Sequence, residues 1–135
     1  MAAREPAHPI EKRDLLHADP PNRPRIQAIA AKLASEGRWP EAIDYLEVAK
    51  DDAILAKAQD DAVARGTVWL LQQVERISGK KCAPELWEKL SEAAAKGERW
   101  RDAVRALALA GKPAEAEALR AEKCADYEPF KPLGK

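Results

Sequence analysis

The sequence has no long apolar run, and no stretch approaches the roughly 18 consecutive apolar residues that a membrane-spanning helix needs. Its first residues, MAAREPAHP, lack the apolar core of a secretory signal peptide. These two absences argue against a membrane-spanning or secreted protein, and we therefore expect a cytoplasmic location.

The chain has no excess of charge of either sign, because 23 Lys and Arg residues balance 23 Asp and Glu residues. Non-specific binding to nucleic acid needs a basic surface that displaces counterions, and anchoring to an anionic membrane also needs basic residues. We therefore expect neither a nucleic-acid nor a membrane partner. Mixed charges, at 34% of the residues, are typical of a solvated helical surface.

Residues that carry catalytic or metal chemistry are few. Cys82 and Cys124 are far apart and form no CxxC pair, and both histidines, His8 and His17, lie near the N-terminus. No neighbouring motif activates either thiol, no His/Cys spacing indicates a metal site, and there is no glycine-rich phosphate loop. The prediction is a protein that is not an enzyme, with no catalytic residue, metal or cofactor. Two reduced thiols fit the cytosol, and the sequence alone leaves a disulfide open.

Aromatic residues are scarce at 5%, and no apolar residues alternate with polar ones, so the sequence predicts no strands. Alanine with Leu, Glu, Lys and Arg is abundant, and these residues favour helices. Apolar residues recur at helical spacing between Gly and Pro residues that mark turns. We therefore expect an all-α protein of six or seven helices. The expected helices span residues 23–35, 40–49, 51–65, 67–78, 84–96, 101–110 and 113–123.

Proline sets the expected domain boundaries, because five of the ten prolines fall before residue 25 and prevent one long helix there. We expect a proline-rich N-terminal arm over 1–22, a helical-repeat domain over 23–123 and an extended C-terminal tail over 124–135.

Two local alternatives stay open. The arm segment PIEKRDLLH, with Ile10, Leu15 and Leu16, either is extended or forms a short helix. The pair Gly66 and Thr67 either separates two helices, which we favour, or kinks one long helix.

Two segments repeat the same junction between helices. EGRWPEAIDYL (36–46) has a glycine that ends one helix, Trp39 at the turn, and a proline that starts the next helix. KGERWRDAVRAL (96–107) repeats the pattern with one extra residue in the turn, and LALAGKPAEAEAL is a third, overlapping copy. With small residues at set distances from the first turn, the chain resembles tetratricopeptide-repeat proteins. Residues 51–83 fit the pattern poorly.

The resemblance implies stacked antiparallel αα-hairpins, a short solenoid of tetratricopeptide type with a groove lined by the first helix of each hairpin. The groove positions carried over to this sequence are Gln27, Ala31, Ser35, Glu85, Glu88, Glu92 and Lys96. These residues depart from the basic carboxylate clamp of some family members, which favours a basic or amphipathic partner. An ordinary helical bundle with glycine-terminated helices is the alternative fold.

The expected function is protein–protein interaction, as an adaptor or scaffold, with a protein or peptide partner of unknown identity. The alternative is a small structural subunit or homo-oligomer that assembles through its N-terminal arm or its C-terminal tail. The apolar tail residues are Tyr127, Phe130 and Leu133. Either segment would equally cap the apolar end of its own array.

The four tryptophans are candidates for interface residues, because tryptophan is common in binding hot spots. Each one also falls near an apolar helical stripe or a turn, and we expect three of the four mainly in the core. They are Trp39, Trp69, Trp87 and Trp100.

Overall fold

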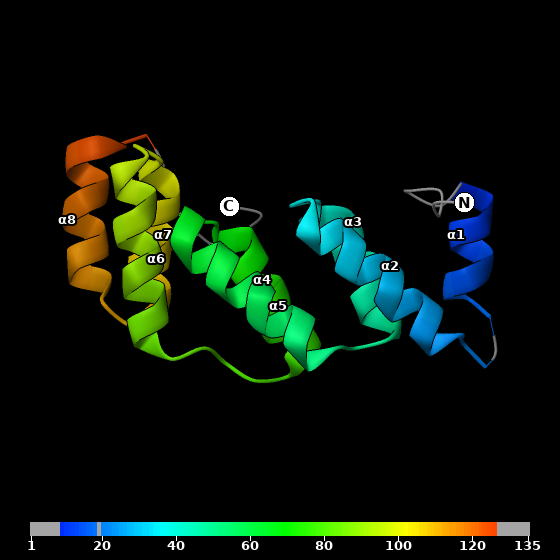
Figure 1. Ribbon diagram of the computed structural model, residues 1–135. Helices are drawn as coiled ribbons and strands as arrows, with labels where there is room; N and C mark the ends of the chain where they lie inside the picture. Colours follow the sequence, from blue (N-terminus) through cyan, green and yellow to red (C-terminus); the bar gives the residue numbers. More distant parts are fainter. Residues whose placement is uncertain (1–8, 19, 127–135) are drawn as a thin grey trace, which may run out of the picture. The chain divides into compact units, whose positions relative to one another are not determined.

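The computed structural model describes residues 9–18 and 20–126, and within them the protein is all-helical, with eight helices and no strand (Figure 1). The predicted all-α class is confirmed. None of the described helices is long and apolar enough to cross a membrane. The helices are α1 (Pro9–Leu16), α2 (Arg23–Ser35), α3 (Trp39–Val48), α4 (Asp52–Arg65), α5 (Val68–Ser78), α6 (Pro84–Lys96), α7 (Trp100–Leu109) and α8 (Pro113–Lys123).

The predicted count of six or seven helices is wrong, because the arm segment PIEKRDLLH forms the additional helix α1. Pro9 stands in its first turn, where the missing N–H of proline leaves no helical hydrogen bond unmade. The Lys12 ammonium lies 2.6 Å from a carboxylate oxygen of Asp44 in α3 and 5.4 Å from the centroid of the Tyr45 ring. The arm therefore contacts its own chain through a charged residue, while Leu15 and Leu16 are half-buried.

Parts of the predicted arm and tail lie outside the described residues. These parts are residues 1–8 and 127–135, which include Tyr127, Phe130 and Leu133. The side chain of Ile10 also lies outside the description, so the predicted division into arm, repeat domain and tail stays a prediction.

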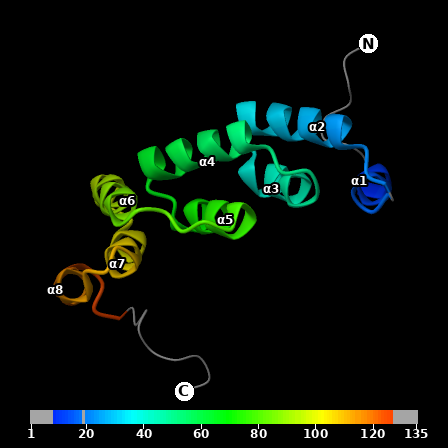
Figure 2. The ribbon, with the colours of Figure 1, turned by 90° about the horizontal axis from the view of Figure 1, so that it is seen from below.

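The chain divides into two compact units, the first over residues 1–58 and 73–79 and the second over 59–72 and 80–135. In the first unit α2 packs against α3. In the second unit α7 packs against both α6 and α8, and Figure 2 shows α7 between these two helices.

The core of the first unit is built on one apolar stripe of α2. The buried residues of α2 are Ile26, Ile29, Ala30, Leu33 and Ala34. They meet the buried face of α3, which consists of Trp39, Ala42, Ile43, Tyr45 and Leu46. Trp39 is only 4% exposed, which confirms its predicted packing at the helix junction.

The core of the second unit contains a buried hydroxyl among small and apolar residues. Trp87, Leu90 and Ala94 of α6 are buried, as are Ala103 and Val104 of α7. Ser91 lies between them in sequence and is also buried, and its Oγ donates to the Ala103 carbonyl at 2.8 Å. Because the hydroxyl has a partner, its burial carries little penalty.

Four turns between consecutive helices share one backbone conformation. In each turn one residue has a left-handed φ: 75° at Gly37, 70° at Gly66, 59° at Glu98 and 80° at Gly111. The residue after it donates its N–H to the carbonyl five positions earlier, at 2.9 to 3.0 Å in all four turns. These bonds satisfy carbonyls that a helix C-terminus would otherwise leave unpaired.

The predicted extra residue in the turn of KGERW is wrong. Gly97 has a φ of −87° and caps α6, so that Glu98 is the residue equivalent to Gly37. Counted from this position, the turns before Trp39 and Trp100 have the same length.

The pair Gly66 and Thr67 separates α4 from α5, as expected. A side chain at Gly66 would be strained by the left-handed backbone, and it would also collide with α6, because a Cβ would lie 2.5 Å from the Ala94 backbone nitrogen. The turn therefore approaches the end of α6 as closely as its backbone allows.

Candidate functional site

The predicted groove residues of α2 mostly serve the fold of their own unit. The Gln27 side-chain amide donates to the Lys50 carbonyl at 3.2 Å, just beyond the end of α3. The Ser35 hydroxyl donates to the Lys32 carbonyl of its own helix at 2.7 Å. Ala31 is exposed. Of these three residues only Ala31 has no hydrogen-bonding role for its side chain.

The predicted groove residues of α6 form an acidic row that ends in a lysine. Glu85, Glu92 and Lys96 are exposed, whereas Glu88 is partly buried and pairs with the Lys112 ammonium in the turn between α7 and α8. The hydrogen bond with Glu88 and the charge of Glu115, at 3.5 Å, raise the pKa of Lys112. Spacings of three and four residues place the three carboxylates along one side of α6.

The α2 and α6 residues lie in different units. The structure brings each set together along its own helix, and the groove that would join them stays a prediction.

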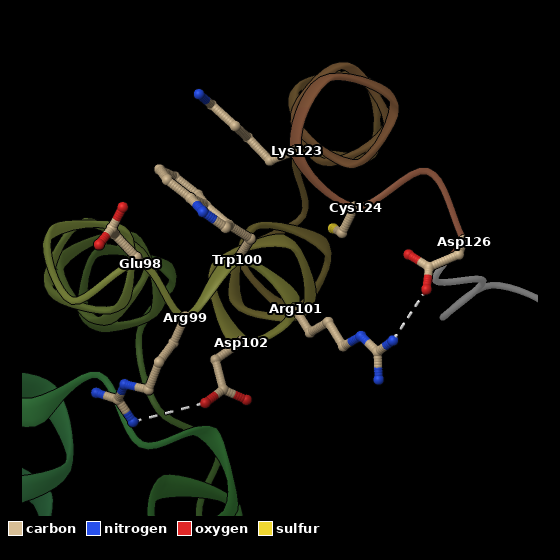
Figure 3. A pocket seen from close by; sticks show the side chains of 8 residues that line it. All are labelled: Glu98, Arg99, Trp100, Arg101, Asp102, Lys123, Cys124 and Asp126. Carbon is tan, nitrogen blue, oxygen red and sulfur yellow. Dashed lines mark hydrogen bonds and ion pairs between the residues drawn. The ribbon is translucent and has the colours of Figure 1, made fainter.

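Sequence reasoning missed an open pocket of about 460 Å³ in the second unit. It lies where the start of α7 meets the end of α8 (Figure 3). Its lining residues are Glu98, Arg99, Trp100, Arg101, Asp102, Lys123, Cys124 and Asp126.

An apolar cluster adjoins this pocket, because Trp100 and Cys124 belong to both. Val104, Ala116 and Cys124 are buried together, and Trp100 packs against them with part of its surface left exposed. Leu107, Ala108 and Leu119 pack against the same cluster. Burial of one part of its surface therefore holds the Trp100 indole in the lining of the pocket.

Charges around the Trp100 ring are arranged in pairs. The Lys123 ammonium lies 5.0 Å from the ring centroid, within the range of a cation–π interaction. Arg101 contacts Asp126 at 3.2 Å, and Arg99 lies 3.6 Å from Asp102.

Glu98 is the exception among these charges, because it is exposed and no ion pair within the described residues involves its carboxylate. Figure 3 shows the Glu98 carboxylate and the Lys123 ammonium on opposite sides of Trp100. Glu98 is also the one non-glycine among the described residues with a left-handed φ. The pocket thus combines an indole, an available carboxylate and a strained backbone position.

The side chains of the pocket offer charged groups and an aromatic surface. Its thiol, Cys124, is buried in the apolar cluster, and its two arginines are held by carboxylates. Within the described part of the chain, no group of three or more His, Cys, Asp or Glu residues is placed to hold a metal ion.

One signal in the sequence points to this pocket. In KGERW a glutamate follows the glycine and holds the position that is glycine in the other turns. This equivalence is visible only once the turns are aligned by their hydrogen bonds. The contact between Trp100 and Lys123 depends on the packing of α7 against α8 and has no local signature.

We expected three of the four tryptophans to lie mainly in the core, and the structure buries two of them. Trp39 and Trp87 are buried, Trp100 is half-buried and Trp69 is 43% exposed.

No family model matches the chain, and no curated protein or solved structure matches it significantly.

Proposed function

We propose that the protein is a non-catalytic, tetratricopeptide-like interaction module that binds a basic or amphipathic peptide segment of a partner protein. Support for the repeat comes from the four turns with one conformation and one set of hydrogen bonds, because helical repeats stack such hairpins into binding surfaces. The observation that carries the choice of partner is the acidic row of α6, in which Glu85 and Glu92 are exposed.

The three glutamates of α6 outnumber its two lysines, Lys89 and Lys96, and this small excess of negative charge favours a cationic ligand. Glu88 pairs with Lys112 at one side of the row, which leaves Glu85 and Glu92 to solvent. These two carboxylates lie about two helical turns apart, and an extended or helical peptide would meet both with two basic residues. Such charges increase the association rate and select the partner more than they add affinity.

The test is a comparison of synthetic peptides of three kinds: basic amphipathic, neutral amphipathic, and acidic at the C-terminus. We expect only the basic amphipathic peptides to bind the full chain, with a dissociation constant that rises with salt. Glu92→Lys should weaken binding roughly fivefold, because reversal replaces an exposed ion pair by repulsion. Isothermal titration calorimetry or fluorescence anisotropy measures both effects.

Asp14→Lys is the matched control, since it makes the same charge change at an exposed residue of α1. It should leave peptide binding within twofold of the unchanged protein. Binding of acidic C-terminal peptides alone, or equal effects of the two substitutions, would overturn the proposal.

Self-association through the arm has weaker support. Lys12 of α1 contacts Asp44 and Tyr45 of the same chain, which favours an arm that folds back on its own unit. Sedimentation of the full chain tests this directly, and a monomer at high concentration is the expected result.

A further inference from the structure

The turn at Glu98 departs from the three turns that share its hydrogen bonds. The left-handed position holds glycine at Gly37, Gly66 and Gly111, and glutamate only here. A side chain in this conformation costs free energy, because the Cβ approaches the following carbonyl. Non-glycine residues in strained backbone regions cluster at functional sites. The Glu98 side chain, which no ion pair within the described residues holds in place, is therefore a candidate for binding.

The neighbouring indole offers a second feature of a cation site. Trp100 already has one cation, the Lys123 ammonium, 5.0 Å from its ring centroid. Glu98 lies on the other side of the ring, at the edge of the same pocket (Figure 3). A cation placed there would meet an indole face and a carboxylate at once, and both groups attract a guanidinium.

The other charged residues of the pocket favour a cation over an anion. Arg99 lies beside Asp102, and Arg101 contacts Asp126, so both arginines already have carboxylate partners. Lys123 lies over the indole and 3.8 Å from Glu122. Glu98 is the remaining charge among the lining residues, and its complement is a single positive group.

We infer that the pocket between the start of α7 and the end of α8 binds one arginine side chain of a partner, with the guanidinium stacked on Trp100 and paired with Glu98. Arginine fits better than lysine because its planar guanidinium stacks on an aromatic face while its N–H groups donate to both oxygens of a carboxylate. The inference rests on the proposed function only for the origin of the arginine, namely a basic peptide.

The experiment uses the full chain, labelled with ¹⁵N, and the blocked peptide acetyl-Gly-Gly-Arg-Gly-Gly-amide. We expect the peptide to shift the Trp100 indole N–H and the Glu98 amide signals, with weak, saturable, salt-sensitive binding. The same peptide with citrulline has nearly the same shape and no charge, and should cause no saturable shift.

Substitutions separate the site from the fold. Glu98→Gln should weaken arginine-peptide binding at least fivefold, whereas Asp14→Asn, which removes the same charge from an exposed residue of α1 outside the pocket, should change it less than twofold. Glu98→Gly should raise the midpoint of thermal unfolding and abolish binding, because glycine relieves the backbone strain and removes the carboxylate. If Glu98 had only a structural role, Glu98→Gly would leave peptide binding unchanged.

Three results would overturn the inference: equal shifts with arginine and citrulline, unchanged binding by Glu98→Gly, or arginine-induced shifts confined to residues outside the pocket. Failure of the two proposals is distinguishable. If basic amphipathic peptides bind in a Glu92-dependent way but the short peptide leaves Trp100 unshifted, only the arginine site fails. If the short peptide shifts the Trp100 signal and the binding of the longer peptides does not depend on Glu92, only the α6 proposal fails.

Discussion

The hairpins α2–α3 and α6–α7 have the same turn and differ in the side chains that the turn carries. In the first hairpin the left-handed residue is Gly37, and Trp39 after it is buried. In the second hairpin these positions hold Glu98 and the half-buried Trp100, which line an open pocket. The same turn geometry is therefore followed by a buried tryptophan in the first hairpin and by a tryptophan that lines a charged, open pocket in the second.

The same two hairpins also connect to the following segment by different chemistry. From equivalent positions on the first helix, Gln27 donates to the Lys50 carbonyl, whereas Glu88 pairs with the Lys112 ammonium. A neutral hydrogen bond depends little on salt and pH, while an exposed ion pair depends on both. We therefore expect the stability of the second hairpin to depend more strongly on salt and pH than that of the first.

The largest expected difference between the hairpins concerns their tryptophans. Trp39→Ala should lower the free energy of unfolding by about 3–5 kcal/mol, because it removes a buried ring and leaves a cavity. Trp100→Ala should cost less than half as much, since part of its ring is already exposed. Urea unfolding of both variants, followed by circular dichroism, measures the difference. Equal losses would show that Trp100 is a core residue like Trp39 and would remove the contrast.

A smaller contrast is expected at the left-handed position. Gly37→Ala should destabilise the protein by about 1 kcal/mol, because alanine is disfavoured at this φ. Glu98→Ala exchanges one non-glycine residue for another and should change stability by less than about 0.5 kcal/mol. Thermal unfolding of the two variants tests the pair, and a large loss from Glu98→Ala would assign the glutamate a structural role.

The smallest expected effect is the salt and pH dependence of the connection made by Glu88. The stability difference between the unchanged protein and Glu88→Gln should shrink between 0.05 and 1 M salt by screening, as the Debye length falls from roughly 14 to 3 Å. For Gln27→Ala, which removes a neutral hydrogen bond, the corresponding difference should stay constant. A salt-independent effect of Glu88→Gln would show that packing of the side chain, and not charge, is responsible.

The pH dependence of the same pair has a definite sign. The pKa of Lys112 is raised from 10.5 in the folded chain by its hydrogen bond with Glu88 and the charges of Glu115 and Glu88. The contribution of the pair is therefore fully present below 10.5 and is lost as the pH rises through the raised pKa. The difference between the unchanged protein and Glu88→Gln should be constant at neutral pH and shrink in strong alkali.

Most helices could be predicted from the sequence, because periodic apolar residues and the flanking Gly and Pro are local signals. The stripe of α2 and the break at Gly66 both follow from such signals. Helix α1 could only be left open, since it is short and its described contact with α3 joins Lys12 to Asp44 across the fold.

The register of the second turn and the pocket could not be predicted in the same way. Glycine is the usual mark of a left-handed residue, so Gly97 misled the alignment, while the conformation belongs to Glu98. Lys123 reaches Trp100 only because α8 packs on α7. The predicted groove residues, by contrast, follow from helical spacing, but Gln27 and Glu88 have intramolecular partners that spacing does not reveal.

The conserved geometry of the turns has a consequence for where the chain tolerates changes in length. The turns at Gly37, Gly66 and Glu98 share one left-handed residue and one hydrogen bond, whereas the linker 79–83 before α6 is longer than the linker 49–51 before α4. No atom lies within 4 Å of the place a Cβ would take at Gly79. Insertions, deletions or a genetically encoded label therefore belong between hairpins, next to Gly79, and not inside them.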